Sequence, residues 1–597
     1  MSTRLRYNEY YEMQEKFDWL YERSKHNATQ SINLLDLITS EANIMIAYRM
    51  IKTNTGAKTA GIDGQTIDSY RIQDKDKFIE HIRKAITDYT PHMVRRVLIP
   101  KANGKKRPLG IPTMRDRMIG QMIMQVLNPI CEAKFYKHSY GFRNNRSTKH
   151  AIARCDKLIF RKYHHVVDID IKGFFDNVNH SLLLSQLYTI GIKDKRVLAL
   201  IGKMLKAPID EIGIPTKGVP QGGILSPLLS NVVLNDLDWW IARQWEEFPT
   251  VRKYKNKNTR QAVLRHTNLK RMFIVRYADD FKVFTRNAND AQKVYHSVRR
   301  YLKNHLKLDI SPEKSSITNL RKRSTEFLGF ELKTVKKGKW HVTHIHVSTK
   351  SINRIKEEIR NHLKNIQRET TLRNVLRYNA YVLGIHQYYK IATHVFTDFK
   401  KLAYQLSKTH YNRLINRGRY EIPRSPPNQY RRLYKTTYRT YKVADTYLYP
   451  LVDITWVMAR PFNPNICDYT KLGRNKHRSL ESNLVEVINR MGHTTMKNEN
   501  IEYYDNRISK YVMQNGKCSV TGFFLDAGII HCHHITPKHF GGTDQFNNLV
   551  IIHKWVHKLI HATNAETIQR YKTLLSLNVK QLDKVNTYRK KCNLTDI

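Results

Sequence analysis

The most constraining feature of this chain is the tetrapeptide Tyr277-Ala278-Asp279-Asp280 together with its flanks. The segments 271–276 and 281–284 on either side of it are largely apolar. Two apolar runs around an acidic turn predict the strands of a β-hairpin that carries adjacent carboxylates at its tip. Two adjacent acids on a turn are usually exposed to solvent and have no catalytic role, so this interpretation depends on the rest of the chain.

A second acidic strand end lies upstream in segment 166–176, which contains Asp168 and Asp170. Carboxylates from two strands can converge to hold a pair of Mg²⁺ ions, which clamp the attacking and leaving oxygens of a phosphoryl transfer. The two segments together predict a nucleic-acid polymerase.

The charge balance favours the same kind of partner. The 597 residues contain 103 Lys and Arg against 51 Asp and Glu, a formal net charge of +52. This excess repels itself unless a polyanion neutralises it, which indicates nucleic-acid binding that weakens with salt. Segment 400–442 is densely basic and rich in Tyr, with Glu421 as its one acid, and we expect it to contact RNA.

Two further segments suit a nucleotide substrate. Residues 95–101 and 104–112 predict a hairpin whose basic turn, flanked by Lys101 and Arg107, is suited to gripping phosphates. The glycine-rich turn 220–223 leads into an apolar helix and permits close backbone approach to a substrate. Each is a weak signal alone, because a basic turn is more often plain surface.

A second chemical site is indicated near the C-terminus. The chain carries His533 and His534 on an expected strand, a Gly-Gly turn, Asn548, and then His557 and His561, four residues apart on an expected helix. A histidine pair on a helix is more often structural, but the ordered set favours a metal-dependent nuclease. His533, His557 and His561 would bind one metal ion, His534 would deprotonate water, and Asn548 would orient the His534 ring.

Cysteine usage and hydropathy bear on location. Six cysteines without a CxxC pair indicate a reducing compartment, and no apolar run approaches the length of a membrane span. The N-terminus lacks the apolar core of a secretion signal. We expect a bacterial cytoplasmic, nucleoid-associated protein with no membrane partner, and an organelle is the alternative.

The ordered motifs resemble those of the reverse transcriptases encoded within group II introns, also called maturases, in the version with an HNH endonuclease. The matching segments are Gly61–Gly64, Arg107–Pro112, Ser139–Arg143, Asp170–Asp176, Pro220–Gly223, Tyr277–Asp280, Pro312–Ser315 and Phe327–Phe330, with looser matches at Asn379–Gly384 and Tyr388–Tyr389. Any one motif is weak, whereas eight in order are very specific.

The resemblance implies an α+β chain with a right-hand polymerase fold. Reverse transcriptase fingers and palm would occupy residues 1–335, and an α-helical thumb (domain X) would occupy 336–450. A DNA-binding region would follow at 451–509, and a ββα-metal HNH nuclease domain at 510–597.

The resemblance also assigns roles by position in the motifs. Asp170 and Asp279 would be metal ligands, with Asp280 completing the pair, and Phe175 would block a 2′-OH and so select deoxynucleotides. Lys101 and Arg107 would bind the incoming triphosphate, and Gln221 would line its pocket. Lys314 would protonate the pyrophosphate leaving group.

The implied cofactors are two Mg²⁺ ions in the polymerase and one divalent metal, Mg²⁺ or similar, in the nuclease. Related HNH domains often hold a structural zinc with two cysteine pairs. Here Cys518 has Thr521 where a partner would sit, and His553 and Val556 take the places of the second pair. No structural zinc is therefore expected.

The function implied is threefold: binding of the intron RNA to promote splicing, nicking of target DNA, and cDNA synthesis by target-primed reverse transcription. The partners would be group II intron RNA in a ribonucleoprotein, target DNA and dNTPs, with a homodimer left open. A free-standing reverse transcriptase and a splicing cofactor with a decayed polymerase are the alternatives. The C-terminal histidines disfavour the first, and intact Asp170 and Asp279 disfavour the second.

Overall fold

The computed structural model describes residues 3–29, 32–70, 72, 74–100, 104, 106–254, 257–464, 466–475, 487, 491, 501–526 and 528–597. One hydrophobic core extends from the N-terminal helices to Tyr469, and a second core lies in the C-terminal part. Lys101, a predicted phosphate-binding residue, lies outside the described residues. No helix in these ranges is long and apolar enough to cross a lipid bilayer.

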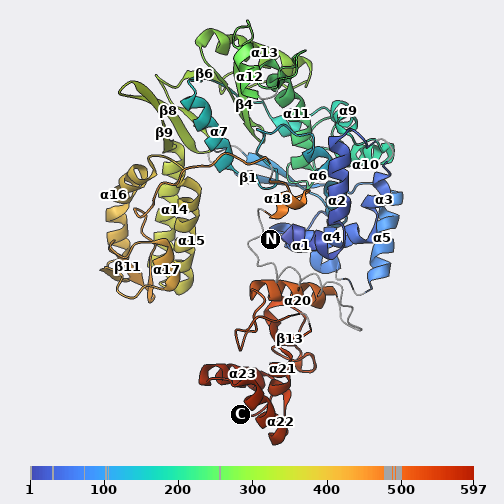
Figure 1. The fold of residues 1–597 in the computed structure, drawn as a ribbon, viewed down its shortest axis with the longest axis vertical. Helices are drawn as coiled ribbons and strands as arrows, with labels where there is room; N and C mark the ends of the chain where they lie inside the picture. Colours follow the sequence, from blue (N-terminus) through green and yellow to red (C-terminus); the bar gives the residue numbers. More distant parts are fainter. Residues whose placement is uncertain are drawn as a thin grey trace.

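The N-terminal half is mostly helical and contains a four-stranded sheet and a separate two-stranded sheet, β1-β2 (Figure 1). Its helices are α1 (Thr3–Tyr10), α2 (Gln14–Lys25), α3 (Leu34–Ile38), α4 (Glu41–Lys52), α5 (Lys75–Thr87), α6 (Met114–Glu132), α7 (Thr148–Phe160), α8 (Phe174–Asn177), α9 (His180–Ile190), α10 (Lys195–Leu205), α11 (Ser226–Gln244), α12 (Lys257–Leu264) and α13 (Ala288–Asn304). The strands are β1 (Arg95–Pro100), β2 (Lys106–Ile111), β3 (His165–Ile169), β4 (Met272–Tyr277), β5 (Asp280–Thr285) and β6 (Ser316–Asn319).

The central sheet is antiparallel with the order β4-β5-β3-β6. The predicted hairpin around the acidic turn is present, with Tyr277 paired to Asp280 across β4 and β5. Val167 of β3 pairs with Val283 of β5 and with Ile317 of β6, so apolar side chains line the middle of the sheet. Because β3 lies beside β5, the acidic end of β3 comes to the same edge as the β4–β5 turn.

A strand hairpin and a three-helix unit follow. The elements are β7 (Thr325–Phe327), β8 (Phe330–Lys337), β9 (Trp340–Val347), α14 (Thr349–Arg368), α15 (Leu372–Tyr389), α16 (Val395–Leu414), β10 (Arg419–Glu421), α17 (Asn428–Leu433), β11 (Thr440–Val443) and β12 (Thr446–Tyr447). Ile355, Ile359 and Leu363 of α14 are fully buried, since α14 packs on both α15 and α16.

The C-terminal unit contains α20 (Ile501–Met513), β13 (Ile530–His534), β14 (Leu549–His553), α21 (Lys554–His561), α22 (Ala565–Leu575) and α23 (Val579–Lys591). Helix α20 runs through the expected boundary at 509/510, and its residues Tyr503, Ile508 and Tyr511 pack in the C-terminal core. That core therefore begins before residue 510. The expected boundary at 335/336 likewise falls within a continuous strand, β8.

The segment that follows β12 runs back from the three-helix unit to the N-terminal helices, where it forms α18 (Lys471–Asn475) (Figure 1). There the Arg474 guanidinium donates to both carboxylate oxygens of Asp18 on α2, at 2.7 and 2.8 Å, and to the carbonyl oxygen of Asp468 at 2.7 Å. The hydroxyl of Tyr469 accepts a 2.6 Å hydrogen bond from Asn128 on α6. These contacts fix the returning segment to the first core.

Replacing Arg474 by Ala should release this segment, because Asp18 would lose a bidentate partner in a nearly buried site. We expect a loss of about 3 kcal/mol in the free energy of unfolding and faster proteolytic cleavage between residues 462 and 475. The control is Arg460→Ala, at an exposed position of the same segment. Equal cleavage rates for the two variants would contradict the docking role.

Candidate active sites

The acidic edge of the central sheet gathers carboxylates from β3 and from the β4–β5 turn. Burial raises the pKa of Asp280 to about 7, although part of its side chain reaches solvent. The carboxylates of Asp168, Asp279 and Asp170 raise this pKa further, whereas the Lys282 ammonium lowers it. The mutual repulsion of these groups is what a bound cation relieves, so the residue set fits divalent metal binding.

The four carboxylates are not equivalent. Asp168 is directly opposite Lys282 in the strand register and forms an ion pair with its buried ammonium. Asp170 lies just beyond β3 and remains half-exposed, with the Lys314 Nζ 3.4 Å from its Oδ2. Its backbone NH donates to the Ser315 hydroxyl at 3.1 Å. Asp170 therefore faces solvent at the site, whereas Asp168 is already neutralised.

A buried ion pair behind the acidic turn holds it in place. The Arg276 guanidinium donates to both oxygens of Asp238 on α11, with the shortest contact 2.6 Å, and both side chains are about 1% exposed or less. It also donates to Asn231 at 2.9 Å and to the carbonyl oxygen of Ala278, within the turn, at 2.8 Å. The Asn231 amide in turn donates to the Gly141 carbonyl at 3.0 Å. One arginine thus links strand, helix and turn.

The turn itself requires close backbone packing. Ala278 has a φ of 58°, in the left-handed region, and the motif around Gly141 lies directly against it. A Cβ on Gly141 would lie 2.2 Å from the Ala278 nitrogen, so only glycine fits there. Tyr140 NH donates to the Arg276 carbonyl at 2.9 Å, which continues the contact into β4.

Hydrogen bonds join the basic hairpin to the glycine-rich turn, as a nucleotide-binding site formed by both segments would require. The Arg107 Nε on β2 donates to Gln221 Oε1 at 2.5 Å, and the Gly110 NH donates to the Gln221 carbonyl at 2.7 Å. Gly222 has a φ of 103°, and a Cβ there would lie 2.7 Å from the Gly110 carbonyl oxygen. Phe175 lines the same groove as Gln221, at the start of α8.

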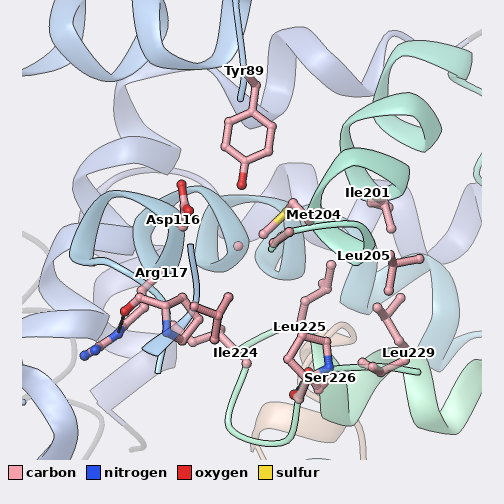
Figure 2. A pocket seen from close by; sticks show the side chains of 17 residues that line it. Tyr89, Asp116, Arg117, Ile201, Met204, Leu205, Ile224, Leu225, Ser226 and Leu229 are labelled. Carbon is pink, nitrogen blue, oxygen red and sulfur yellow. Dashed lines mark hydrogen bonds between the residues drawn. The ribbon is translucent and has the colours of Figure 1, made fainter. Parts of the chain in front are cut away.

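A small pocket lies behind the glycine-rich turn, between α6, α10 and the start of α11 (Figure 2). Figure 2 shows the Tyr89 hydroxyl and the Met204 side chain directed into it and the Arg117 guanidinium directed away. The lining is largely apolar, and the Ser226 hydroxyl donates to the Pro220 carbonyl at 2.7 Å. The turn is therefore supported from behind by packing and one internal hydrogen bond.

The C-terminal histidines lie on a ββα unit formed by β13, β14 and α21. Antiparallel pairing places His533 opposite Val550 and His534 opposite Leu549. His533 is 2% exposed, and its Nε2 has no hydrogen-bond partner among the described residues. Burial lowers its pKa to about 3, with further lowering by His561, His531 and His534. A buried, neutral imidazole with an orphaned nitrogen fits a metal ligand.

Two of the three predicted metal ligands lie in one candidate metal cluster. One ligand atom each of His533, His561 and Cys592, the C-cap of α23, lies within 4.8 Å of the others. His557 is not part of this group, although its ring centroid is 5.4 Å from that of His533 and 4.6 Å from that of His561. His557 packs closest to His531, with 3.5 Å between ring centroids. No sequence pattern indicated Cys592, because it lies 31 residues beyond His561.

The partner of His534 differs from the expected one. Its Nε2 lies 2.7 Å from Asp544 Oδ1, whereas the Asn548 amide donates to the carbonyl oxygens of Thr536 and Thr543, both at 2.9 Å. The Asn548 Oδ1 accepts from the Thr536 NH at 2.8 Å. Asn548 therefore closes the loop between the strands, and the expectation that it orients the His534 ring is corrected: Asp544 does so.

Together, the fold and the acidic site define a polymerase of the reverse transcriptase class. Residues 99–332 match the family model described as reverse transcriptase (RNA-dependent DNA polymerase). The chain belongs to the family of group II intron-encoded proteins. It is similar to the group II intron-encoded protein LtrA of Lactococcus lactis, with 31% identity over 60% of this chain and 70% of that protein.

The chain is also similar to two further proteins. Protein YkfC of Escherichia coli is 34% identical over 48% of this chain and 79% of its own length. The mitochondrial nuclear intron maturase 2 of Arabidopsis thaliana is 25% identical over 31% of this chain and 29% of its own length.

Replacing Arg276 by Met should destabilise the protein by about 3–5 kcal/mol, because it leaves the Asp238 carboxylate buried without a partner. The double variant Arg276→Met with Asp238→Leu should lose less, since it removes both charges. Urea unfolding of the two variants measures the difference. The control is Lys270→Met, which removes a partly exposed ammonium 3.8 Å from Asp290 and should lower the free energy of unfolding by less than about 1 kcal/mol. Equal losses in the single and double variants would contradict the pairing argument.

Proposed function

We propose that this protein binds group II intron RNA, promotes its splicing, nicks target DNA and copies the intron by target-primed reverse transcription. The observation that carries the polymerase part is the meeting of Asp170 with Asp279 and Asp280 at one edge of the sheet. Similarity to an intron maturase supports the splicing role. The net charge of +52 supports a polyanionic partner such as the intron RNA.

The domain assignments are part of the proposal. Fingers and palm would lie before β8, and α14, α15 and α16 would form the thumb. The returning segment after β12 would begin the DNA-binding region, and the ββα unit would be the HNH nuclease.

In the polymerase, Asp170 and Asp279 would hold two Mg²⁺ ions, with Asp280 beside them. The ions when bound neutralise charge on the triphosphate and lower the barrier to attack by the primer hydroxyl. Lys282 keeps Asp168 out of this set through its ion pair. Lys314, 3.4 Å from Asp170, is close enough to the metal ligands to protonate the departing pyrophosphate.

Binding of the dNTP would use the joined hairpin and turn. Arg107 would contact the triphosphate, along with Lys101, and the hydrogen bond from Arg107 to Gln221 pre-sets the guanidinium beside the pocket. Phe175 in the shared groove would exclude a 2′-OH. Positioning and electrostatics, rather than covalent chemistry, would account for the rate.

In the nuclease, His533, His557 and His561 would hold one divalent metal, which when bound polarises the scissile phosphate. His534 would take the proton from water. Its hydrogen bond to Asp544 fixes the orientation of the ring.

Asp279→Asn should lower cDNA synthesis on an RNA template at least about a hundredfold, because loss of one ligand charge removes several kcal/mol of stabilisation. Intron RNA binding, measured by filter retention at fixed salt, should remain. The control is Asp76→Asn, at an exposed position in the first turn of α5. Loss of RNA binding together with synthesis would refute the separation of the two roles.

His534→Ala should reduce nicking of a target DNA duplex by about 10²–10⁴-fold, the range for loss of a general base, and leave primer extension intact. Asp544→Asn should reduce nicking less, since the base remains. His539→Ala, an exposed histidine five residues on, serves as control. Undiminished nicking by His534→Ala would show that another group is the base.

A further inference from the structure

A second histidine cluster lies away from both sites, where strand β9 meets helix α16. His344 and His346 are two residues apart on β9 and so point to the same face, and His394 is the N-cap of α16. One ring nitrogen of each lies within 4.8 Å of the others. The His394 ring is 4.1 Å from that of His344 and 4.4 Å from that of His346, between centroids.

Hydrogen bonds already fix two of the rings. The Nδ1 of His346 lies 3.0 Å from Asp398 Oδ1, and the other carboxylate oxygen of Asp398 accepts from the Val347 NH at 2.9 Å. A carboxylate held by the backbone in this way favours a proton on Nδ1 of His346. The lone pair of Nε2 is then available to a ligand.

His394 is fixed by a hydroxyl. Its Nδ1 lies 2.9 Å from Thr393 Oγ1, which accepts from the Ile345 NH at 2.9 Å and donates to the Ile345 carbonyl at 3.2 Å. The Ile345 carbonyl also accepts from the His394 backbone NH at 3.1 Å. In the tautomer with the proton on Nδ1, His394 donates to the Thr393 hydroxyl, and its Nε2 is available to a ligand.

The donor atoms of the cluster select the kind of ion. In the β8–β9 register Lys333 lies opposite His344 and Glu331 lies opposite His346. Three imidazole nitrogens in one place disfavour Mg²⁺ or Ca²⁺, which depend on anionic oxygen ligands, and favour ions that bond strongly to imidazole.

We propose that His344, His346 and His394 form a binding site for a borderline transition-metal ion such as Zn²⁺, with a fourth position open to water. The ion would join the β8–β9 hairpin to α16, two elements separated by about 50 residues of chain, and so stabilise their junction. This site is independent of the polymerase and nuclease assignments, since none of its residues belongs to either.

The test is a zinc titration of the full-length protein after removal of metal by a chelator. Bound zinc per chain is counted by elemental analysis for wild type, for the double variant His344→Ala with His394→Ala, and for His341→Ala. His341 is the matched control, because it lies on the same strand but outside the cluster. The wild type and His341→Ala should bind one more zinc ion than the double variant.

Two further measurements distinguish loss of the metal site from misfolding of the double variant. Co²⁺ added to the wild type should give the visible absorption of a site with three nitrogen ligands, and this absorption should survive Cys592→Ser and His561→Ala. Asp398→Asn keeps all three ligands and should weaken zinc binding about 10- to 100-fold. Equal zinc stoichiometry in all variants, or a Co²⁺ absorption lost with His561→Ala, would show that the three rings only pack together.

Discussion

The ion pair between Arg276 and Asp238 is the contact on which the polymerase site depends. A charge buried to this degree is tolerated only with a well-aligned partner, and Arg276 has five hydrogen bonds to Asp238, Asn231 and Ala278. Burial raises the pKa of Asp238, and the guanidinium opposes the rise. The pair fixes the helix α11, the strand β4 and the left-handed residue of the acidic turn in one arrangement. The carboxylates proposed as metal ligands are thus held by residues that are buried behind the acidic turn.

The same logic recurs at the other sites. Lys282 neutralises Asp168, so the acids that remain at the edge of the sheet are those that face solvent. In the C-terminal unit Asp544 orients His534, and in the β9–α16 junction Asp398 orients His346. In each place a charged residue that makes no contact with a substrate sets the geometry of one that would. Asp238 and Asp544 are buried acids with such a role, whereas Asp398 is only partly buried.

Local patterns were sufficient for the elements of the candidate sites. The apolar runs on both sides of Asp279 predicted a hairpin, and the spacing of His557 and His561 predicted one face of a helix; both elements are present. The boundaries expected at 335/336 and 509/510 fall within β8 and α20, which continue through these positions. A unit is delimited by which core the side chains of a segment enter.

The order of residues along the chain specifies which chemical groups are available: paired acids between apolar strands, a glycine-rich turn, a basic hairpin and an ordered set of histidines. Which of these groups meet depends on how the helices and strands pack. Cys592 joins His533 and His561, Asp544 rather than Asn548 holds His534, and His394 joins His344 and His346 from a different element. The physical reason is that sequence periodicity reports the face of a strand or helix on which a side chain lies. The partner on that face is chosen by the packing of elements distant in the chain.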